Sequence, residues 1–501
     1  MNENLTKITY TKSLGKTNFN STLSIAIDSN VNIKTVLSTQ AYMFDEKIEC
    51  LNGKAILTAK IGLKVLYIDT DGISNTITEN QTITETLINP AITTDSYICI
   101  NNTNIIANIL SNDGVLKVSC DVSLLPILYF NLPLTNNIED FENVINKKSE
   151  INSSLITNFI NTSFNYTTNF ETKLKISKIL CHDAYFTPTE ISAKQNMIYV
   201  EGKICSRILF EANENDNITR TELFDIFNVS QNIEVEGLNP EQCLDLNFCL
   251  DKSGETLATE FEDDNSIITI TNKIKVCGVA IKNVTIEIVD DAFSTQHNTE
   301  LTFTKRDFTT LHCSEIIQDK IFGEIVLTDK EPAIEDIVAN LCISPEITNF
   351  YIKNNALHFE GVITSQLCYE DENKQSLTKK LEFPFILNSK LEFENVDNVY
   401  ANIHIENCKI KAKRGTIIEM EYSVEIRVRK YSKQTAQMVD NITLGAELNF
   451  NGYDYQIYIG KPNETIWELC KRIKINPTKL SEINKNLPLV LSGGEKIVIK
   501  R

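Results

Sequence analysis

Three segments of the chain share one pattern of apolar and polar positions. They are ILTAKIGLKVLY from Ile56 to Tyr67, YVEGKICSRILF from Tyr199 to Phe210, and HFEGVITSQLCY from His358 to Tyr369. Aligned without gaps, they superpose Ile61 on Ile204 and Ile363, and each ends in an aromatic ring. Side chains two residues apart share a face of a strand, so the pattern predicts three β-strands with one apolar face each.

Further segments recur around these strands. An apolar pair precedes each copy, at Ile33/Val36, Ile176/Ile179 and Ile334/Ile337, and alternating runs that start at Leu116, Ile270 and Ile418 follow. The copies are 143 and 159 residues apart, which suits whole domains of antiparallel strands better than a solenoid. We therefore predict a mainly β chain with three modules, at residues 1–135, 155–290 and 320–445. Polar linkers are expected at 136–154 and 291–319.

The C-terminal segment follows a different pattern. Tyr455 to Ile459 alternates as a strand, and Thr465 with Glu468 forms a capping box at the start of a helix. Pro477 stands at a favoured first-turn position for a second helix, and Lys496 to Lys500 alternates again. These signals predict a small α+β (βααβ) domain over residues 453–501.

Two resemblances follow from these motifs. The repeated segments resemble the SPOCS domain of spore-coat and cell-wall-associated proteins, with the third copy matching best through Pro332, Ile334, Ile337, Glu360, Gly361 and Tyr369. The C-terminal segment resembles a LysM domain. That family has a Gly-Asp pair where this chain has Asn463-Glu464. LysM domains commonly bind N-acetylglucosamine polymers between two loops, so the resemblance implies a binding groove at these places: Lys461, Pro462, Asn463, Glu464, Thr465, Ile466, Trp467, Asn484, Leu487 and Pro488.

Charge and cysteine content narrow the class of protein. The formal charge is −19, which disfavours a general nucleic-acid binder. Residues 455–501 nevertheless carry nine Lys and Arg against four Glu, so a basic terminal domain follows an acidic body. We expect neither a signal peptide nor a membrane-spanning segment. The 13 cysteines are scattered without a Cys-x-x-Cys pair, which predicts a reducing compartment inside the cell.

The chain offers no recognisable catalytic motif. Neither HExxH nor GxSxG occurs, and the five histidines are dispersed. The adjacent pairs Cys181-His182 and His312-Cys313 would point to opposite faces of a strand, which does not favour a shared metal ion. We therefore expect a protein that is not an enzyme and needs no metal or cofactor.

The order of the modules suggests a function. Three SPOCS-like modules followed by one LysM domain resemble a family of coat-assembly proteins of clostridial sporulation. The resemblance implies a coat scaffold in the mother-cell cytoplasm at the forespore surface, with a LysM domain that binds the coat ATPase SpoIVA. The alternative is a spore or cell-wall protein whose LysM domain binds peptidoglycan.

Overall fold

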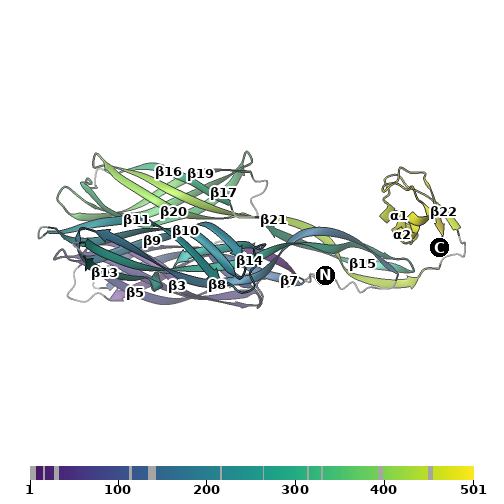
Figure 1. Ribbon diagram of the computed structural model, residues 1–501, viewed down its shortest axis with the longest axis horizontal. Coiled ribbons are helices and arrows are strands. Elements are labelled where there is room, and N and C mark those ends of the chain that lie inside the picture. Colours follow the sequence, from purple (N-terminus) through teal and green to yellow (C-terminus); the bar gives the residue numbers. More distant parts are fainter. Residues whose placement is uncertain are drawn as a thin grey trace.

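The computed structural model describes residues 7–14, 17–26, 33–111, 115–133, 143–214, 217–262, 265–312, 315–328, 331–392, 399–449 and 455–500. These residues form antiparallel sheets with only two short α-helices, so the predicted mainly β fold is confirmed. Figure 1 shows a body made of three β units, an arm that extends from it, and a small C-terminal unit near the far end of the arm.

The first unit contains a three-stranded sheet and a larger one. Its strands are β1 (Lys7–Ser13), β2 (Thr17–Ala26), β3 (Ile33–Leu51), β4 (Lys54–Asp69), β5 (Ser74–Ile88), β6 (Tyr97–Ser111) and β7 (Val115–Pro133). The small sheet has the order β3-β4-β5. In the large sheet, β7 is central, with β1 and β2 on one side and β6 on the other.

The second unit repeats this arrangement. Its elements are β8 (Val144–Thr172), β9 (Lys175–Lys194), β10 (Met197–Glu214), β11 (Asn217–Glu234), β12 (Cys243–Leu250), a short 3-10 helix (Lys252–Gly254), β13 (Thr256–Glu262) and β14 (Asn265–Ser294). The small sheet has the order β11-β10-β9. In the large sheet, β14 lies between β8 on one side and β12 and β13 on the other.

The third unit has the same two sheets. Its strands are β15 (His297–Leu311), β16 (Glu315–Val326), β17 (Asp336–Lys353), β18 (Ala356–Glu370), β19 (Ser376–Glu392), β20 (Val399–Lys413) and β21 (Ile417–Glu447). The small sheet has the order β17-β18-β19. In the large sheet, β21 pairs with β15 and β16 along one edge and with β20 along the other.

The repeated sequence pattern occupies equivalent places in the three units. The aligned segments are the central strands of the small sheets, β4, β10 and β18, and the closing alternating runs are the central strands of the large sheets. Ile61, Ile204 and Ile363 are all fully buried. The alternation thus predicted the buried face of each central strand correctly, because its side chains pack against the large sheet of the same unit.

A β-bulge recurs beside each central strand. On β9 the extra residue lies opposite the Glu201–Gly202 step, and on β17 it lies opposite the Glu360–Gly361 step. A Cβ atom on Gly202 would stand 2.7 Å from the main-chain oxygen of Thr187, and one on Gly361 would stand 2.3 Å from that of Glu346. Glycine is therefore used where the bulged partner strand comes close to the central strand.

The predicted linkers are largely strands of the arm, and the linker prediction is wrong for these residues. Residues 144–154 are the first part of β8, which pairs with the last part of β14, and residues 297–311 are β15, which pairs with the last part of β21. The end of the predicted linker at 315–319 lies in β16. Residues 136–142 of the first predicted linker lie outside the described residues.

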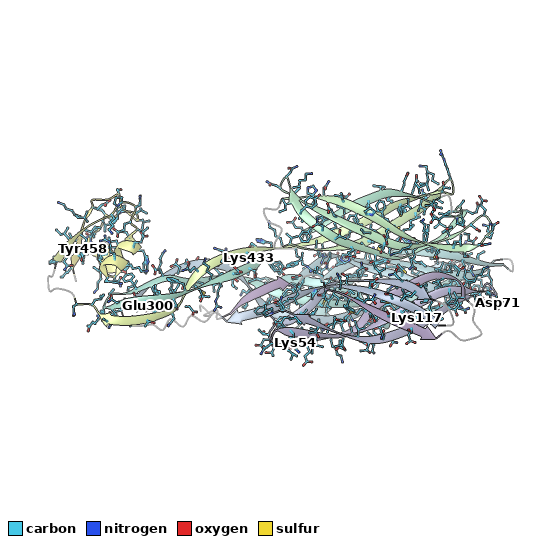
Figure 2. All side chains as sticks on the ribbon, turned by 180° about the vertical axis from the view of Figure 1, so that it is seen from behind. Lys54, Asp71, Lys117, Glu300, Lys433 and Tyr458 are labelled. Atoms are coloured by element: carbon cyan, nitrogen blue, oxygen red, sulfur yellow. The ribbon has the colours of Figure 1, made fainter. Side chains whose placement is uncertain are left out.

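The arm is two paired ribbons packed face to face. Apolar side chains between them are Ile151, Ile286, Ile288, Phe308 and Met438, followed toward the tip by Val289, Ala292, Val439 and Ile442. Figure 2 places Glu300 and Lys433 along this arm, and both side chains are exposed. Because each ribbon buries only one face, half of its positions can be polar, which explains why these segments resembled linkers in the sequence.

One buried carboxylate joins the large sheets of all three units. The Tyr129 hydroxyl of β7 donates to Asp245 Oδ2 of β12 at 2.7 Å, and the Tyr431 hydroxyl of β21 donates to the same oxygen. Arg429 Nε lies 2.8 Å from Asp245 Oδ1. Gly278 on β14 makes room for this strand, because a Cβ there would stand 2.0 Å from the Asp245 carbonyl oxygen. The side chains of Tyr129, Asp245, Arg429 and Tyr431 are called the junction cluster.

Candidate functional site in the C-terminal unit

The C-terminal unit folds as its capping signals predict. It consists of β22 (Tyr455–Ile459), α1 (Ile466–Ile473), α2 (Pro477–Ile483) and β23 (Lys496–Lys500), and β22 pairs with β23 antiparallel. The Thr465 hydroxyl accepts from the Glu468 amide at 3.2 Å, and the Glu468 carboxylate accepts from the Thr465 amide at 2.8 Å. The capping box and the helix start at Pro477 are therefore confirmed.

The unit has its own small core, and several predicted site residues pack against it. Leu469, Cys470, Leu480, Ile497 and Ile499 are fully buried. The Asn484 amide donates to the carbonyls of Leu480 and Val498, and its oxygen accepts from the Val498 amide at 2.9 Å. Asn484 thus joins α2 to β23. Leu487 also packs half-buried against this core.

The two loops of the predicted groove are hydrogen-bonded to each other. The Asn463 amide donates to the Leu491 carbonyl at 2.8 Å, and the Leu491 amide donates to the Glu464 carbonyl at 2.8 Å. Farther along, the Ile466 amide donates to the Leu489 carbonyl at 3.1 Å. Asn463 has a φ of +60°, a left-handed conformation that asparagine tolerates better than most residues. The turn forms without the glycine that LysM sequences have at this place.

Glu464 turns inward and does not line an open surface. Its side chain is buried and accepts two hydrogen bonds from Arg472, at 2.7 and 2.9 Å. The hydrogen bond from Arg472 holds the pKa of Glu464 below its ordinary value. The neighbouring residues Lys461, Pro462 and Asn463 are exposed, as is Pro488 on the second loop.

An exposed aliphatic surface lies where the two loops meet. The Leu489 side chain is 85% exposed and that of Val490 is 51% exposed, next to half-buried Ile466. We call these three residues the loop patch. The site residues predicted from the sequence include Ile466 but not Leu489 or Val490, although two adjacent aliphatic residues after Pro488 were a usable signal. Exposed apolar groups of this kind mark interaction surfaces more often than single surface residues do.

Trp467, the single tryptophan of the chain, faces the arm. Its ring meets Phe293 near the end of β14 edge to face, with centroids 5.1 Å apart, and its indole N–H donates to Asp291 Oδ2 at 2.7 Å. Lys471 Nζ lies 2.5 Å from Asp291 Oδ1. The tryptophan therefore attaches the C-terminal unit to the arm, as does Lys471, and the sequence could not indicate a partner 176 residues away.

A β-bulge positions the arm side of this contact. Val289 pairs with Lys148 and Asp291 with Lys147, so Asp290 is the extra residue. A bulge changes which face the following side chains take, and Asp291 and Phe293 both contact the C-terminal unit. Partial burial would raise the pKa of Asp291, but the hydrogen bonds from Lys471 and Trp467 outweigh it and hold the pKa below its ordinary value.

We expect Asp291→Ala to release the C-terminal unit from the arm. The variant leaves the indole N–H and Lys471 without their acceptor, at a cost of about 1–2 kcal/mol to the contact. Trp467 is the only tryptophan, so a red shift of its fluorescence and easier quenching by acrylamide measure the release. Glu287→Ala on the same strand, whose ion pair with Lys148 is exposed, is the matched control and should leave the emission unchanged.

Acid should have the same effect as this substitution. The folded-state pKa of Asp291 is depressed, so its contribution is present above the ordinary carboxyl pKa of 3.8 and is lost as the pH falls through the lower folded value. In the wild type, an acid-induced red shift should therefore begin below about pH 4, and Asp291→Ala, whose emission is already red-shifted at pH 7, should show no further shift. If the emission spectrum of Asp291→Ala at pH 7 were the same as that of the wild type, Asp291 would not be what holds the unit to the arm.

Comparisons with protein-family models, curated proteins and solved structures find no match for this chain. Within the described residues, neither helix approaches the length and apolar character that a bilayer-crossing segment needs. The same residues contain no cluster of three or more His, Cys, Asp or Glu side chains arranged to hold a metal ion.

Proposed function

We propose that this chain is a non-enzymatic scaffold of spore-coat assembly that docks onto another protein through its C-terminal LysM-like unit. The proposed partner is the coat ATPase SpoIVA, and the proposed place is the mother-cell cytoplasm at the forespore surface and the coat itself. The proposal starts from the sequence resemblance to SPOCS modules and to a LysM domain, in the order found in SipL-type proteins.

The observation that carries the choice of a protein partner is the exposed loop patch. Leu489 and Val490 present aliphatic carbon to solvent where the two loops meet. The outward side of β22 adds exposed Tyr455, Ile457 and Ile459 to the same small unit. Apolar side chains of this kind fit the buried centre of a protein interface.

The position of Trp467 favours a protein over a sugar. A glycan site needs an aromatic face or a set of polar groups to receive the sugar. Here the indole already contacts Phe293 and Asp291. The side chains of Glu464 and Asn484 form hydrogen bonds within the C-terminal unit. The arm also supports a scaffold role, because it holds the binding unit away from the body (Figure 1).

We expect Leu489→Asp to weaken binding to SpoIVA at least tenfold, because a charged group would be buried in an apolar contact. Binding of the full chain to immobilised SpoIVA polymer, measured by biolayer interferometry, tests this. Ile88→Asp is the matched control, since Ile88 is 81% exposed on β5 of the body. Both positions are exposed, so neither variant should disturb folding.

A second measurement separates the protein partner from the glycan. The wild-type chain is pelleted with insoluble peptidoglycan and, separately, with SpoIVA polymer. Retention on SpoIVA alone, lost in Leu489→Asp, supports the proposal. Retention on peptidoglycan without affinity for SpoIVA would replace it by the glycan-binding alternative.

A further inference from the structure

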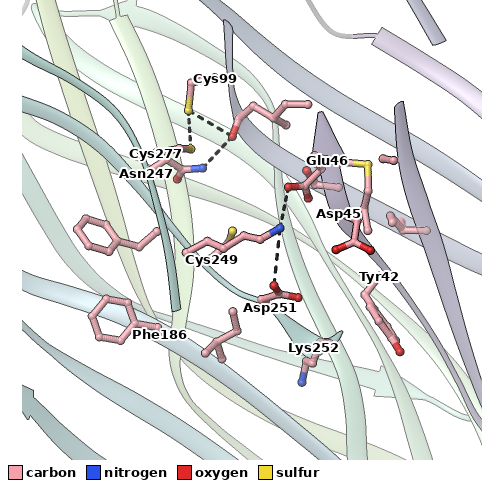
Figure 3. A pocket seen from close by; sticks show the side chains of 18 of the residues that line it. Tyr42, Asp45, Glu46, Cys99, Phe186, Asn247, Cys249, Asp251, Lys252 and Cys277 are labelled. Carbon is pink, nitrogen blue, oxygen red and sulfur yellow. Dashed lines mark hydrogen bonds and ion pairs between the residues drawn. The ribbon is translucent and has the colours of Figure 1, made fainter. Parts of the chain in front are cut away.

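A large cavity lies between the three units of the body. Its volume is about 1000 Å³, and its walls come from β3 and β6 of the first unit, β9, β12 and β14 of the second, and β17 and β20 of the third. Five cysteines line it, among them Cys99 on β6, Cys249 on β12 and Cys277 on β14, which Figure 3 labels. None of them takes part in the proposed function.

Two of these thiols are in direct contact across a unit boundary. Cys99 Sγ of the first unit lies 2.6 Å from Cys277 Sγ of the second, although 178 residues separate them in the chain. Both residues border the cavity, but Cys99 is buried whereas Cys277 is half-buried. A small oxidant in the cavity would therefore meet Cys277 first.

The main chain around Cys99 is held in place from both sides. The Tyr97 hydroxyl donates to the Ile160 carbonyl of the second unit at 2.8 Å, and the Asn247 amide of the second unit donates to the Ile100 carbonyl at 3.0 Å. Cys99 also packs with Ile156, Val279 and Ile281 of the second unit. Joining the two sulfurs therefore requires no relative movement of the units.

We propose that Cys99 and Cys277 are a site of reversible disulfide formation that covalently links the first unit to the second. With glutathione disulfide as oxidant, the Cys277 thiolate attacks one sulfur of the oxidant, and one glutathione thiolate leaves. The Cys99 thiolate then attacks the Cys277 sulfur of the mixed disulfide, and the second glutathione thiolate leaves. The two protein thiols lose two electrons and two protons, and one glutathione disulfide becomes two glutathione molecules.

The surroundings set the speed of this reaction. The hydrogen bond with Cys277, together with burial, raises the pKa of Cys99 well above its ordinary value. Because only the thiolate reacts, linkage should be slow at pH 7 and faster at pH 9. Cys249 lies diagonally across the β12–β14 pair from Cys277, since Asn247 is opposite Cys277 and Cys249 is opposite Lys275. It is the competing partner that an experiment must distinguish.

Peptide mapping of the oxidised full chain tests the assignment. Trypsin places Cys99 in the peptide 65–117 and Cys277 in the peptide 276–282, each with one cysteine. After incubation with glutathione disulfide, alkylation and digestion, mass spectrometry should find these two peptides linked, and dithiothreitol should separate them. Linkage of Cys277 to Cys249, or no linkage of Cys277 to any protein cysteine at pH 9, would overturn the proposal.

Stability supplies an independent readout. A link that closes a loop of this length should raise the unfolding temperature of the oxidised chain by roughly 5 °C or more. Cys99→Ser and Cys277→Ala should each abolish this rise, and the second variant keeps the test valid if the first folds poorly. Cys120→Ser, at a buried cysteine of the first unit's own core, is the control and should keep the full rise. An equal rise in Cys277→Ala would show that the link lies elsewhere.

Discussion

Asp245→Ala is expected to lower the free energy of unfolding by about 3–5 kcal/mol, because it removes the only carboxylate of the junction cluster. Arg429 would remain buried without its ion pair, and the hydroxyls of Tyr129 and Tyr431 would lose their shared acceptor. Burial by itself would lower the pKa of Arg429, but the nearby Asp245 outweighs it and keeps the guanidinium charged. The variant therefore leaves a buried positive charge that it cannot neutralise.

The variant should lose stability because the contacts between the three units are weakened. Thermal unfolding of the variant should begin roughly 10 °C lower than in the wild type. Asp307→Ala is the matched control, because Asp307 forms an exposed ion pair with Lys433 on the arm at 2.9 Å, and such pairs contribute about 1 kcal/mol or less. If both variants unfolded at similar temperatures, the junction cluster would not be what holds the three units together.

Glu425→Gln is expected to stabilise the protein by about 2 kcal/mol at pH 8 and to have almost no effect at pH 5. Glu425 lies on β21 with no exposed surface, and its Oε1 has no hydrogen-bond partner among the described residues. Its Oε2 is 3.5 Å from Gln318 Nε2, at the limit of a hydrogen bond. Burial raises the pKa of Glu425 to about 7, although the nearby Arg427 opposes this.

The raised pKa of Glu425 determines how the stability of the wild type changes with pH. Between the ordinary value of 4.5 and about 7, the folded protein binds a proton that the unfolded chain does not. Wild-type stability therefore falls as the pH rises through this window, whereas glutamine stays neutral and avoids the penalty. Denaturant unfolding at pH 5 and pH 8 measures the difference.

A neighbouring carboxylate, whose pKa is shifted in the opposite direction, provides the control. Glu421 on the same strand lies 2.8 Å from Lys320, and the hydrogen bond from Lys320 lowers its pKa. Glu421→Gln should thus lose a little stability at pH 8 and gain none. A gain at pH 8 in both variants, or the same gain for Glu425→Gln at both pH values, would contradict the assignment of a buried, costly charge to Glu425.

The arm and the C-terminal unit bear directly on the proposed function. Asp291 and Phe293 attach the unit through Trp467 and Lys471, whereas the loop patch uses Ile466, Leu489 and Val490. The attachment and the proposed docking surface thus use different side chains of one small unit. Asp291→Ala should free the unit without removing the loop patch, so a measurement of the proposed SpoIVA binding in this variant tests whether attachment to the arm matters for docking.

The sequence by itself determined the local structure. Alternation placed Ile61, Ile204 and Ile363 on buried strand faces, because one residue in two must be apolar when one face of a sheet is covered. Capping chemistry at Thr465 and the fixed φ of Pro477 set both helix starts within the C-terminal unit. These features depend on residues close together in the chain, where short-range rules suffice.

Only the tertiary structure decided which element the polar segments form and which partners Trp467, Asp245 and Cys99 contact. Residues 144–154 and 297–311 resembled linkers because a ribbon with one solvated face carries as many polar residues as a loop. Trp467 contacts Asp291 and Phe293, Asp245 contacts Tyr129 and Arg429, and Cys99 contacts Cys277. Each partner lies more than a hundred residues away, and no local pattern encodes such a pairing, because it is set by how the three units and the C-terminal unit pack against one another.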